Sequence, residues 1–185
     1  MRIPAAIPDF TPESGREWAL ATDPEIVTGL AWGRPRPGHP EGAVGRHVAA
    51  LLAAIDEGEP SLRADLRFLA IVHDALKHRV RPEAGYSPDN DHAVLARRFA
   101  ERYTGDARLL VALELHDEPY WLWRTRGDDG VAALHSVLHR VPDRELFLRF
   151  VELDASTDGK DPGLLAWVRA ATGPAANRPV GALAA

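Results

Sequence analysis

Apolar residues recur every three or four positions along most of this chain, which is the spacing of one face of an α-helix. The clearest stretch, 66–77, places Leu69 and His73 on the same face and ends in an adjacent imidazole and carboxylate, those of His73 and Asp74. Lys77 follows His73 by one helical turn. Two polar groups therefore end a helix whose face belongs in the core.

The same spacing predicts a series of helices separated by Pro- and Gly-containing turns. They cover 12–20, 41–55, 61–79 with Ser61 as its N-cap, a helix from Asp89 or Asn90 to Tyr103, 106–115, 131–138, 142–155 and 163–171. We expect a loop over 81–91 and an aromatic turn over 120–124. Nothing alternates as a strand, and no repeat is present. The sequence predicts an all-α helical bundle.

Three regions differ in composition. Residues 1–40 hold seven of the fifteen prolines, and we expect an irregular arm that packs on the domain through its large aromatic residues, Phe10, Trp18 and Trp32. Residues 41–172 form the helical domain. Residues 173–185 form a flexible tail.

Composition removes several classes of function. The formal net charge of −5 gives no electrostatic reason to bind nucleic acid or an anionic membrane, and no apolar run has the length of a membrane span. A cytoplasmic protein is expected. The chain has no cysteine, so disulfides and thiolate metal sites are absent. Nitrogen and oxygen ligands remain, which suit Mn, Fe, Mg, Co or Zn.

Six polar side chains lie on, or at the end of, apolar helical faces. They are His47, His73, Asp74, His92, His116 and Asp154. Each alone has a simple explanation as a hydrogen-bonded core residue or a helix-end residue. Together they suggest a metal site, because buried imidazoles and carboxylates need compensation. Four neutral imidazoles, two carboxylates and two divalent ions sum to about +2, which with Lys77 favours a phosphate substrate.

The order of these residues resembles that of the HD-domain superfamily, over about residues 39–156. His47, the His73-Asp74 pair and Asp154 match its core motif, and His39-Pro40-Glu41-Gly42 is similar to the segment before its first helix. The further His92 and His116 match its two-metal branch. The segment from His73 to Lys77 resembles the HD-x-x-K form of some phosphodiesterases.

The resemblance implies a division of the ligands between two metal ions. His47, His73, Asp74 and Asp154 would hold one ion, and Asp74 would bridge to a second. His92 and His116 would complete the second site. A bridging hydroxide would attack phosphorus, and Lys77 would bind the phosphoryl oxygens.

The segment after His116 departs from one branch of that superfamily. It reads Asp117-Glu118-Pro119-Tyr120 and lacks the His-His-Glu and Gly-Tyr-Pro elements of cyclic-di-GMP enzymes. We therefore expect a metal-dependent phosphohydrolase acting on a nucleotide or another small phosphorylated compound. There are two alternatives: a di-iron oxygenase with the same ligands, and a domain that binds a ligand without turning it over. The sequence leaves the oligomeric state open.

Several other polar residues have both a functional and a structural interpretation. His39 lines a site entrance or lies in a plain loop, and Asp117 orients a ligand or caps a helix. The aromatic residues of 120–124, which are Tyr120, Trp121 and Trp123, stack on a base or, more commonly, pack the domain.

The remaining candidates are expected at the surface. His78 and the pair His135 and His139 are predicted to be solvated. Possible phosphate contacts, each better explained as surface charge, are Arg79, Arg81 and Lys160. Two rivals to Asp154, neither of which continues its apolar stripe, are Asp158 and Asp161.

Overall fold

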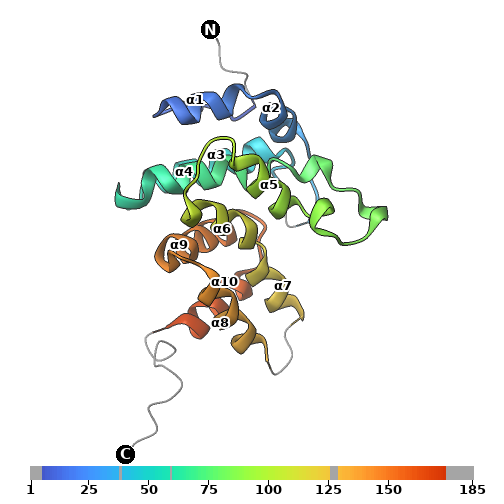
Figure 1. Ribbon diagram of the computed structural model, residues 1–185, viewed down its shortest axis with the longest axis vertical. Coiled ribbons are helices and arrows are strands. Elements are labelled where there is room, and N and C mark those ends of the chain that lie inside the picture. Colours follow the sequence, from blue (N-terminus) through green and yellow to red (C-terminus); the bar gives the residue numbers. More distant parts are fainter. Residues whose placement is uncertain (1–5, 38, 59, 126–128, 174–185) are drawn as a thin grey trace, which may run out of the picture.

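The protein is described by a computed structural model covering residues 6–37, 39–58, 60–125 and 129–173 (Figure 1). Its α-helices are α1 (Gly15–Thr22), α2 (Pro24–Ala31), α3 (Val44–Asp56), α4 (Arg63–Val72), α5 (His92–Ala100), α6 (Ala107–Leu115), α7 (Glu118–Thr125), α8 (Gly130–Arg140), α9 (Arg144–Ala155) and α10 (Pro162–Thr172). Short 3₁₀ turns are η1 (Pro60–Leu62), η2 (Lys77–Arg79), η3 (Pro82–Ala84) and η4 (Pro88–Asn90). Within the described ranges the only β pairing is one isolated bridge between Arg36 and His39. The all-α prediction is confirmed.

Helix α4 lies at the centre of the bundle and contacts α1, α3, α6 and α9. Every side chain from Phe68 to Val72 is fully buried, with 0% exposure. A helix with neighbours on all sides needs apolar residues all round, not a single stripe. This explains why the sequence shows a nearly continuous apolar run here. The residues that follow α4 are thereby held in the middle of the molecule.

The helices around α4 bury one face each, as their apolar spacing predicts. Val48 and Leu51 of α3 and Phe147 and Phe150 of α9 are all fully buried. Helix α3 packs on α4 and α9, and α6 packs on α4 and α5. These contacts bring together the ends of helices that are far apart in the sequence.

The N-terminal region is more regular than expected, since it forms two helices in place of an irregular arm with one helix over 12–20. Asp23 separates them: it follows α1 directly and its carboxylate accepts hydrogen bonds from the backbone N–H groups of Glu25 and Ile26 in α2. Pro24 occupies the first position of α2, where its missing N–H costs nothing. The same carboxylate accepts hydrogen bonds from Arg102 and Tyr103, at 2.7 Å each.

Helices α1 and α2 lie at one end of the molecule and contact α4 and α3 respectively (Figure 1). A buried ion pair links α1 to α4: Arg67 donates to both oxygens of Glu17 at 2.9 Å. Helix α2 approaches the turn after α4 so closely that a Cβ built on Gly29 would lie 1.6 Å from the carbonyl oxygen of Ala75. Only glycine fits there. The division into an arm, a domain and a tail stays a prediction, and 174–185 lie outside the described residues.

Three predicted elements differ in form, bounds or capping. The helix predicted over 61–79 ends at Val72, because the backbone then tightens into i→i+3 hydrogen bonds from Ala75 to Val72 and from Lys77 to Asp74. Its start is also different, since Ser61 lies in η1 and is not the N-cap. The expected aromatic turn at 120–124 is part of helix α7. Asp91, and neither Asp89 nor Asn90, caps α5.

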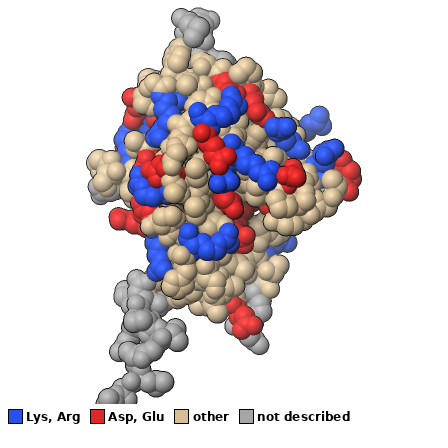
Figure 2. Space-filling view, in the orientation of Figure 1, with Lys and Arg blue, Asp and Glu red and all other residues tan. Residues whose placement is uncertain are grey.

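The surface shows no region of a single charge on the face drawn in Figure 2, where basic and acidic side chains alternate. Over the described ranges, no helix combines the length and the apolar character needed to cross a membrane.

Candidate metal centre

The six predicted ligands come from five places in the fold. His47 lies in α3, and His73 and Asp74 form the turn after α4. His92 is the first residue of α5, His116 directly follows α6, and Asp154 lies near the end of α9. Helix ends supply most of these side chains, so the backbone turns aim them at a common centre.

One group of ligand atoms comes from His47, His73 and Asp74, which all lie within 4.8 Å of one another. All three side chains are buried. Asp154 adjoins this group, because its Oδ1 lies 2.9 Å from Nε2 of His47. The four residues predicted to share one ion are therefore neighbours.

The second group consists of Asp74, His92 and His116, again with ligand atoms within 4.8 Å of one another. Nε2 of His92 and Nε2 of His116 lie 3.5 and 3.6 Å from Oδ1 of Asp74. The two imidazole nitrogens lie 3.3 Å apart. Asp74 belongs to both groups, which is the arrangement that a bridging carboxylate requires.

Backbone carbonyls fix the orientation of two of the imidazoles. Nδ1 of His73 lies 3.0 Å from the carbonyl oxygen of Ala70, and Nδ1 of His116 lies 2.8 Å from that of Leu113. A carbonyl can only accept, so each Nδ1 carries the proton and each Nε2 faces the centre as a potential ligand. This is how metal-binding histidines are usually held.

Five buried atoms at the centre have no hydrogen-bond partner among the described residues. They are Nδ1 and Nε2 of His47, Nε2 of His73, Oδ1 of Asp74 and Oδ1 of Asp154. His47 and Asp154 are close, but their angles do not make a hydrogen bond. Leaving such atoms unpaired in the interior costs about 1–3 kcal/mol each. A metal ion satisfies several at once, so the residues present fit a metal.

The electrostatics keep most of these groups in the form that binds metal. Burial lowers the pKa of His73 to about 3 and also lowers the pKa of His92, so both imidazoles are neutral near pH 7. Burial alone would raise the pKa of Asp74, but the positive charge of His73, which is protonated only at low pH, and that of Lys77 outweigh it and hold that pKa well below its usual range. Asp154 is likewise ionised, because His47 and Lys160 outweigh the effect of burial on its pKa.

His116 is the exception. Burial disfavours its charged form, but Asp117 and Asp74 outweigh burial and raise the pKa of His116 to about 9. Without a metal, this imidazole carries a second proton at neutral pH. A cation that binds Nε2 must displace that proton.

Lys77 contacts the shared carboxylate directly. Its ammonium donates to Oδ2 of Asp74 at 2.6 Å, although it lies in η2 and not one turn along α4. Burial would lower the pKa of Lys77, but Asp74 and Asp117 outweigh it and raise that pKa, so the side chain is charged. Lys77 also borders the cavity described next, where an anion could reach it.

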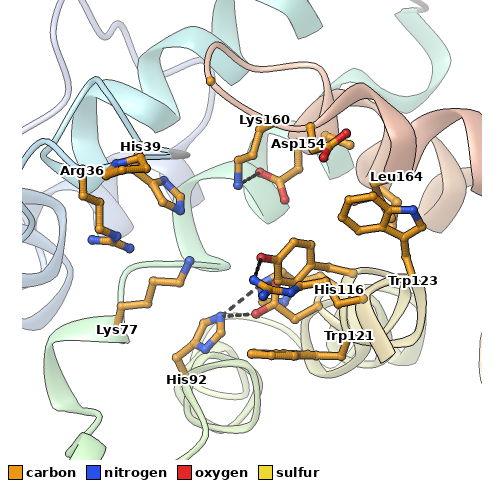
Figure 3. Close-up of a pocket in the computed structure, with 18 residues that line it drawn as sticks. Arg36, His39, Lys77, His92, His116, Trp121, Trp123, Asp154, Lys160 and Leu164 are labelled. Carbon is orange, nitrogen blue, oxygen red and sulfur yellow. Dashed lines mark hydrogen bonds and ion pairs between the residues drawn. The ribbon is translucent and has the colours of Figure 1, made fainter. Parts of the chain in front are cut away.

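The centre opens into a cavity of about 930 Å³ (Figure 3). Its lining includes His92, His116 and Asp154 of the centre and, further out, Arg36, His39, Lys77, Asp117, Tyr120, Trp121, Trp123, Arg124 and Lys160. Three of the six predicted ligands thus border a space that a small molecule can enter, whereas His47, His73 and Asp74 do not line it. Two of the basic side chains that line this cavity, those of Arg36 and Arg124, have no signal in the sequence that marks them as site residues.

Other predicted candidates near the centre have specific contacts. His39 borders the cavity and its Nδ1 lies 3.1 Å from Oε1 of Glu41. Oε1 of Glu41 also lies 3.9 Å from Nδ1 of His47. Asp117 contacts Nε2 of His92 at 3.2 Å, and Lys160 contacts Oδ1 of Asp154 at 3.8 Å. Glu41 was part of the His-Pro-Glu-Gly signal, but nothing in the sequence indicated its position beside His47.

The remaining candidates lie outside the two ligand groups. His78 is half-buried, not solvated, with Nδ1 2.9 Å from the carbonyl oxygen of Ala75. His135 is also half-buried, with Nε2 3.1 Å from the carbonyl oxygen of Ala171, whereas His139 is exposed beside Arg144. Arg79 pairs with Glu25, and neither Arg81 nor Asp158 borders the cavity. Asp161 does border the cavity, and its side chain caps α10.

No protein-family model, curated protein or solved structure matches the chain. The fold and the geometry of the centre therefore stand on the residues themselves. They define an all-helical protein with a candidate site for a metal ion, built from His47, His73, Asp74, His92 and His116.

Proposed function

We propose that this protein is a metal-dependent phosphohydrolase with two divalent ions, acting on a nucleotide or another small phosphorylated compound. The observation that carries the proposal is the position of Asp74, which belongs to both groups of potential ligands. Two-metal centres of this kind are widely used to hydrolyse phosphate esters. The resemblance of the ligand order to the two-metal branch of the HD-domain superfamily supports the same function.

Each residue has a role in this proposal. His47, His73, Asp74 and Asp154 would hold one ion, and Asp74, His92 and His116 the other. The ions would lower the pKa of water and stabilise negative charge on the phosphoryl oxygens. Lys77 borders the cavity beside Asp74, and its ammonium would bind and orient a phosphoryl oxygen there. Water would add to phosphorus as the bond to the leaving oxygen breaks, with the proton of the water passing to that oxygen or to solvent.

Metal analysis and phosphate release test this proposal together. The purified protein is analysed for metal content and then assayed with added Mn²⁺ against a panel of nucleoside and sugar phosphates. We expect about two ions per chain and release of phosphate that is lost in Asp74→Asn. Asp89→Asn, which changes an exposed carboxylate outside the cavity, should retain activity. A protein that binds metal but releases phosphate from no compound would contradict the proposal.

A di-iron oxygenase is the second candidate, because four imidazoles and two carboxylates with no thiolate also suit iron. Oxygen uptake by the iron-loaded protein, together with an electron paramagnetic resonance signal of mixed-valence iron, would favour it. A protein without metal, and without activity when metals are added, would instead be a ligand-binding domain.

A further inference from the structure

The cavity is much larger than a phosphate group requires. At about 930 Å³ it lies at the upper end of the range for sites that bind whole small molecules. A phosphoryl group beside Lys77 would fill a small part of it. The rest of the substrate must therefore contact the walls that lie away from the metal ligands.

One of these walls is aromatic. Tyr120, Trp121 and Trp123 of α7 line it together with Leu164 of α10. The ring of Tyr120 lies 5.5 Å from that of Trp121 and 6.2 Å from that of Trp123, measured between centroids. The three rings thus form one cluster, which we call the aromatic wall. None of its residues belongs to the two groups of potential metal ligands.

Two contacts help to hold the aromatic wall in place. The hydroxyl of Tyr120 accepts a hydrogen bond from Arg124 at 2.9 Å. A Cβ built on Gly163 would lie 3.1 Å from Cζ2 of Trp123, so that indole already abuts the start of α10. A platform that is fixed before binding loses little entropy when a ligand settles on it.

Trp121 differs from its neighbours because its side chain is largely uncovered. It is 55% exposed, although it borders the cavity (Figure 3). Exposing a large aromatic surface to water is unfavourable, and an exposed apolar surface inside a cavity is typical of a ligand contact. Because it is 55% exposed, Trp121 is not a residue that packs the interior of the domain.

The cavity also carries positive charge. Arg36 and Lys160 line it in addition to Lys77, and Arg124 lines it beside Tyr120 of the aromatic wall. No ion pair joins the guanidinium of Arg36 to a described residue, whereas Lys160 faces Asp154. A ligand that suits both features is an anion with a flat ring. Flat rings stack on indole through their faces, and each such contact contributes about 1–3 kcal/mol.

We propose that the substrate is a phosphate ester of a planar aromatic or heteroaromatic group, such as an aryl or nucleoside phosphate, and that this ring stacks on Trp121. The proposal rests on the proposed function for the phosphate end. It adds a residue that selects the substrate, because a saturated group of equal size cannot stack.

The test compares two inert ligands of nearly equal size, benzylphosphonate and cyclohexylmethylphosphonate. Binding to the Mn²⁺-loaded protein is measured by calorimetry under argon, so that neither hydrolysis nor oxidation consumes them. We expect benzylphosphonate to bind more tightly. Trp121→Ala should weaken benzylphosphonate by about 5- to 150-fold and the cyclohexyl compound by much less. Trp121→Phe, which keeps a flat ring, should restore most of the difference.

Tyr86→Ala is the matched control, since Tyr86 is 83% exposed and does not border the cavity. It should leave both affinities unchanged. Equal weakening of both ligands by Trp121→Ala, an unchanged affinity for benzylphosphonate in that variant, or no binding of either to the wild-type protein would each overturn the proposal. Phosphate release and metal content are measured separately. A failure of the aromatic contact is therefore distinguishable from a failure of the hydrolase.

Discussion

At the scale of single residues, His92 and His116 have the most specific role in the candidate centre. Both approach Oδ1 of Asp74, at 3.5 and 3.6 Å, and neither belongs to the group formed with His47 and His73. In the proposed two-ion centre, removing either one would leave the second ion with too few protein ligands, while the first site would keep all of its own. Substitution of His92 or His116 should therefore affect metal binding at the second site and leave the first site occupied.

We expect His92→Ala and His116→Ala each to lower the metal content from about two ions per chain to about one. Elemental analysis after gel filtration measures this directly. His139→Ala serves as the control, because His139 is exposed and belongs to neither ligand group. If both variants kept two ions, the assignment of the second site would be wrong.

His116 also predicts how metal affinity changes with pH. Because its pKa is about 9 in the metal-free protein, the proposed second ion would displace one proton at neutral pH. His73 and His92, whose pKa values are lowered, release none. The apparent affinity for the second ion should thus rise about tenfold per pH unit up to pH 9 and level off above it.

Calorimetric titration with Mn²⁺ between pH 7 and pH 10 measures this slope. Running each titration in two buffers of different ionisation enthalpy counts the released proton independently. If the affinity for Mn²⁺ did not change between pH 7 and pH 9, Asp117 and Asp74 would not hold a second proton on His116.

At the scale of elements, the position of the turn that carries His73 and Asp74 depends on Gly29 in α2. A methyl group there would lie 1.6 Å from a backbone oxygen, that of Ala75, and no side-chain rotation relieves such a contact. Alanine is otherwise the better residue in a helix, by about 1 kcal/mol. The clash outweighs this preference, because moving packed backbone costs about 1–3 kcal/mol or more.

Gly29→Ala should therefore lower the free energy of unfolding by about 2 kcal/mol and weaken metal binding, since the turn must move. Gly15→Ala is the matched control: it is also in a helix, but a Cβ there has no neighbour within 4 Å. It should leave metal binding unchanged and should not lower the free energy of unfolding. Urea unfolding and metal analysis measure the two effects. Normal metal content in Gly29→Ala would show that α2 does not position the turn.

This example also shows what the sequence could and could not predict about the elements. Local signals were sufficient where a helix start and an apolar stripe agree, as at Asp106, where the sequence places the start of a helix and where the side chain caps α6. They failed at 73–79, where Leu76 and Lys77 continue the helical spacing but tight turns replace the helix. They failed again at Pro24, which suggested irregular structure and instead begins α2.

The candidate site was predictable to a similar degree. Apolar spacing identified which polar side chains face inward, because each of the six is one or two turns from core residues. It could not identify Glu41 or Arg36, which reach the site from the segment between α2 and α3 and have no periodic signal. Nor could it separate Trp121, which is exposed to the cavity, from its packed neighbours.

At the scale of the whole molecule, the candidate centre joins the layers of the bundle. Its residues come from α3, the turn after α4, α5, the end of α6 and α9, which together span most of the domain. Helices α7 and α10 add no predicted ligand but form the wall of the cavity. The candidate centre thus brings together side chains from five segments that are far apart in the sequence.

Metal binding should consequently stabilise the entire fold and not only the site. The unfolded chain cannot bring these five segments together, so the free energy of binding adds to the free energy of folding. At a metal concentration about 1,000 times the dissociation constant this amounts to about 4 kcal/mol. For a chain of this size, that corresponds to a rise of about 10 °C in the midpoint of thermal unfolding.

Differential scanning calorimetry of the metal-loaded and chelator-treated protein measures this difference. Asp74→Asn should show little of it, because Asp74 belongs to both groups of ligands. In the Asp74→Asn variant, an amide replaces the carboxylate and so removes a buried charge among the imidazoles and Lys77. Equal midpoints with and without metal in the wild-type protein would mean that the five segments are held in place by packing alone, and that the unpaired nitrogen and oxygen atoms at the centre do not bind a cation.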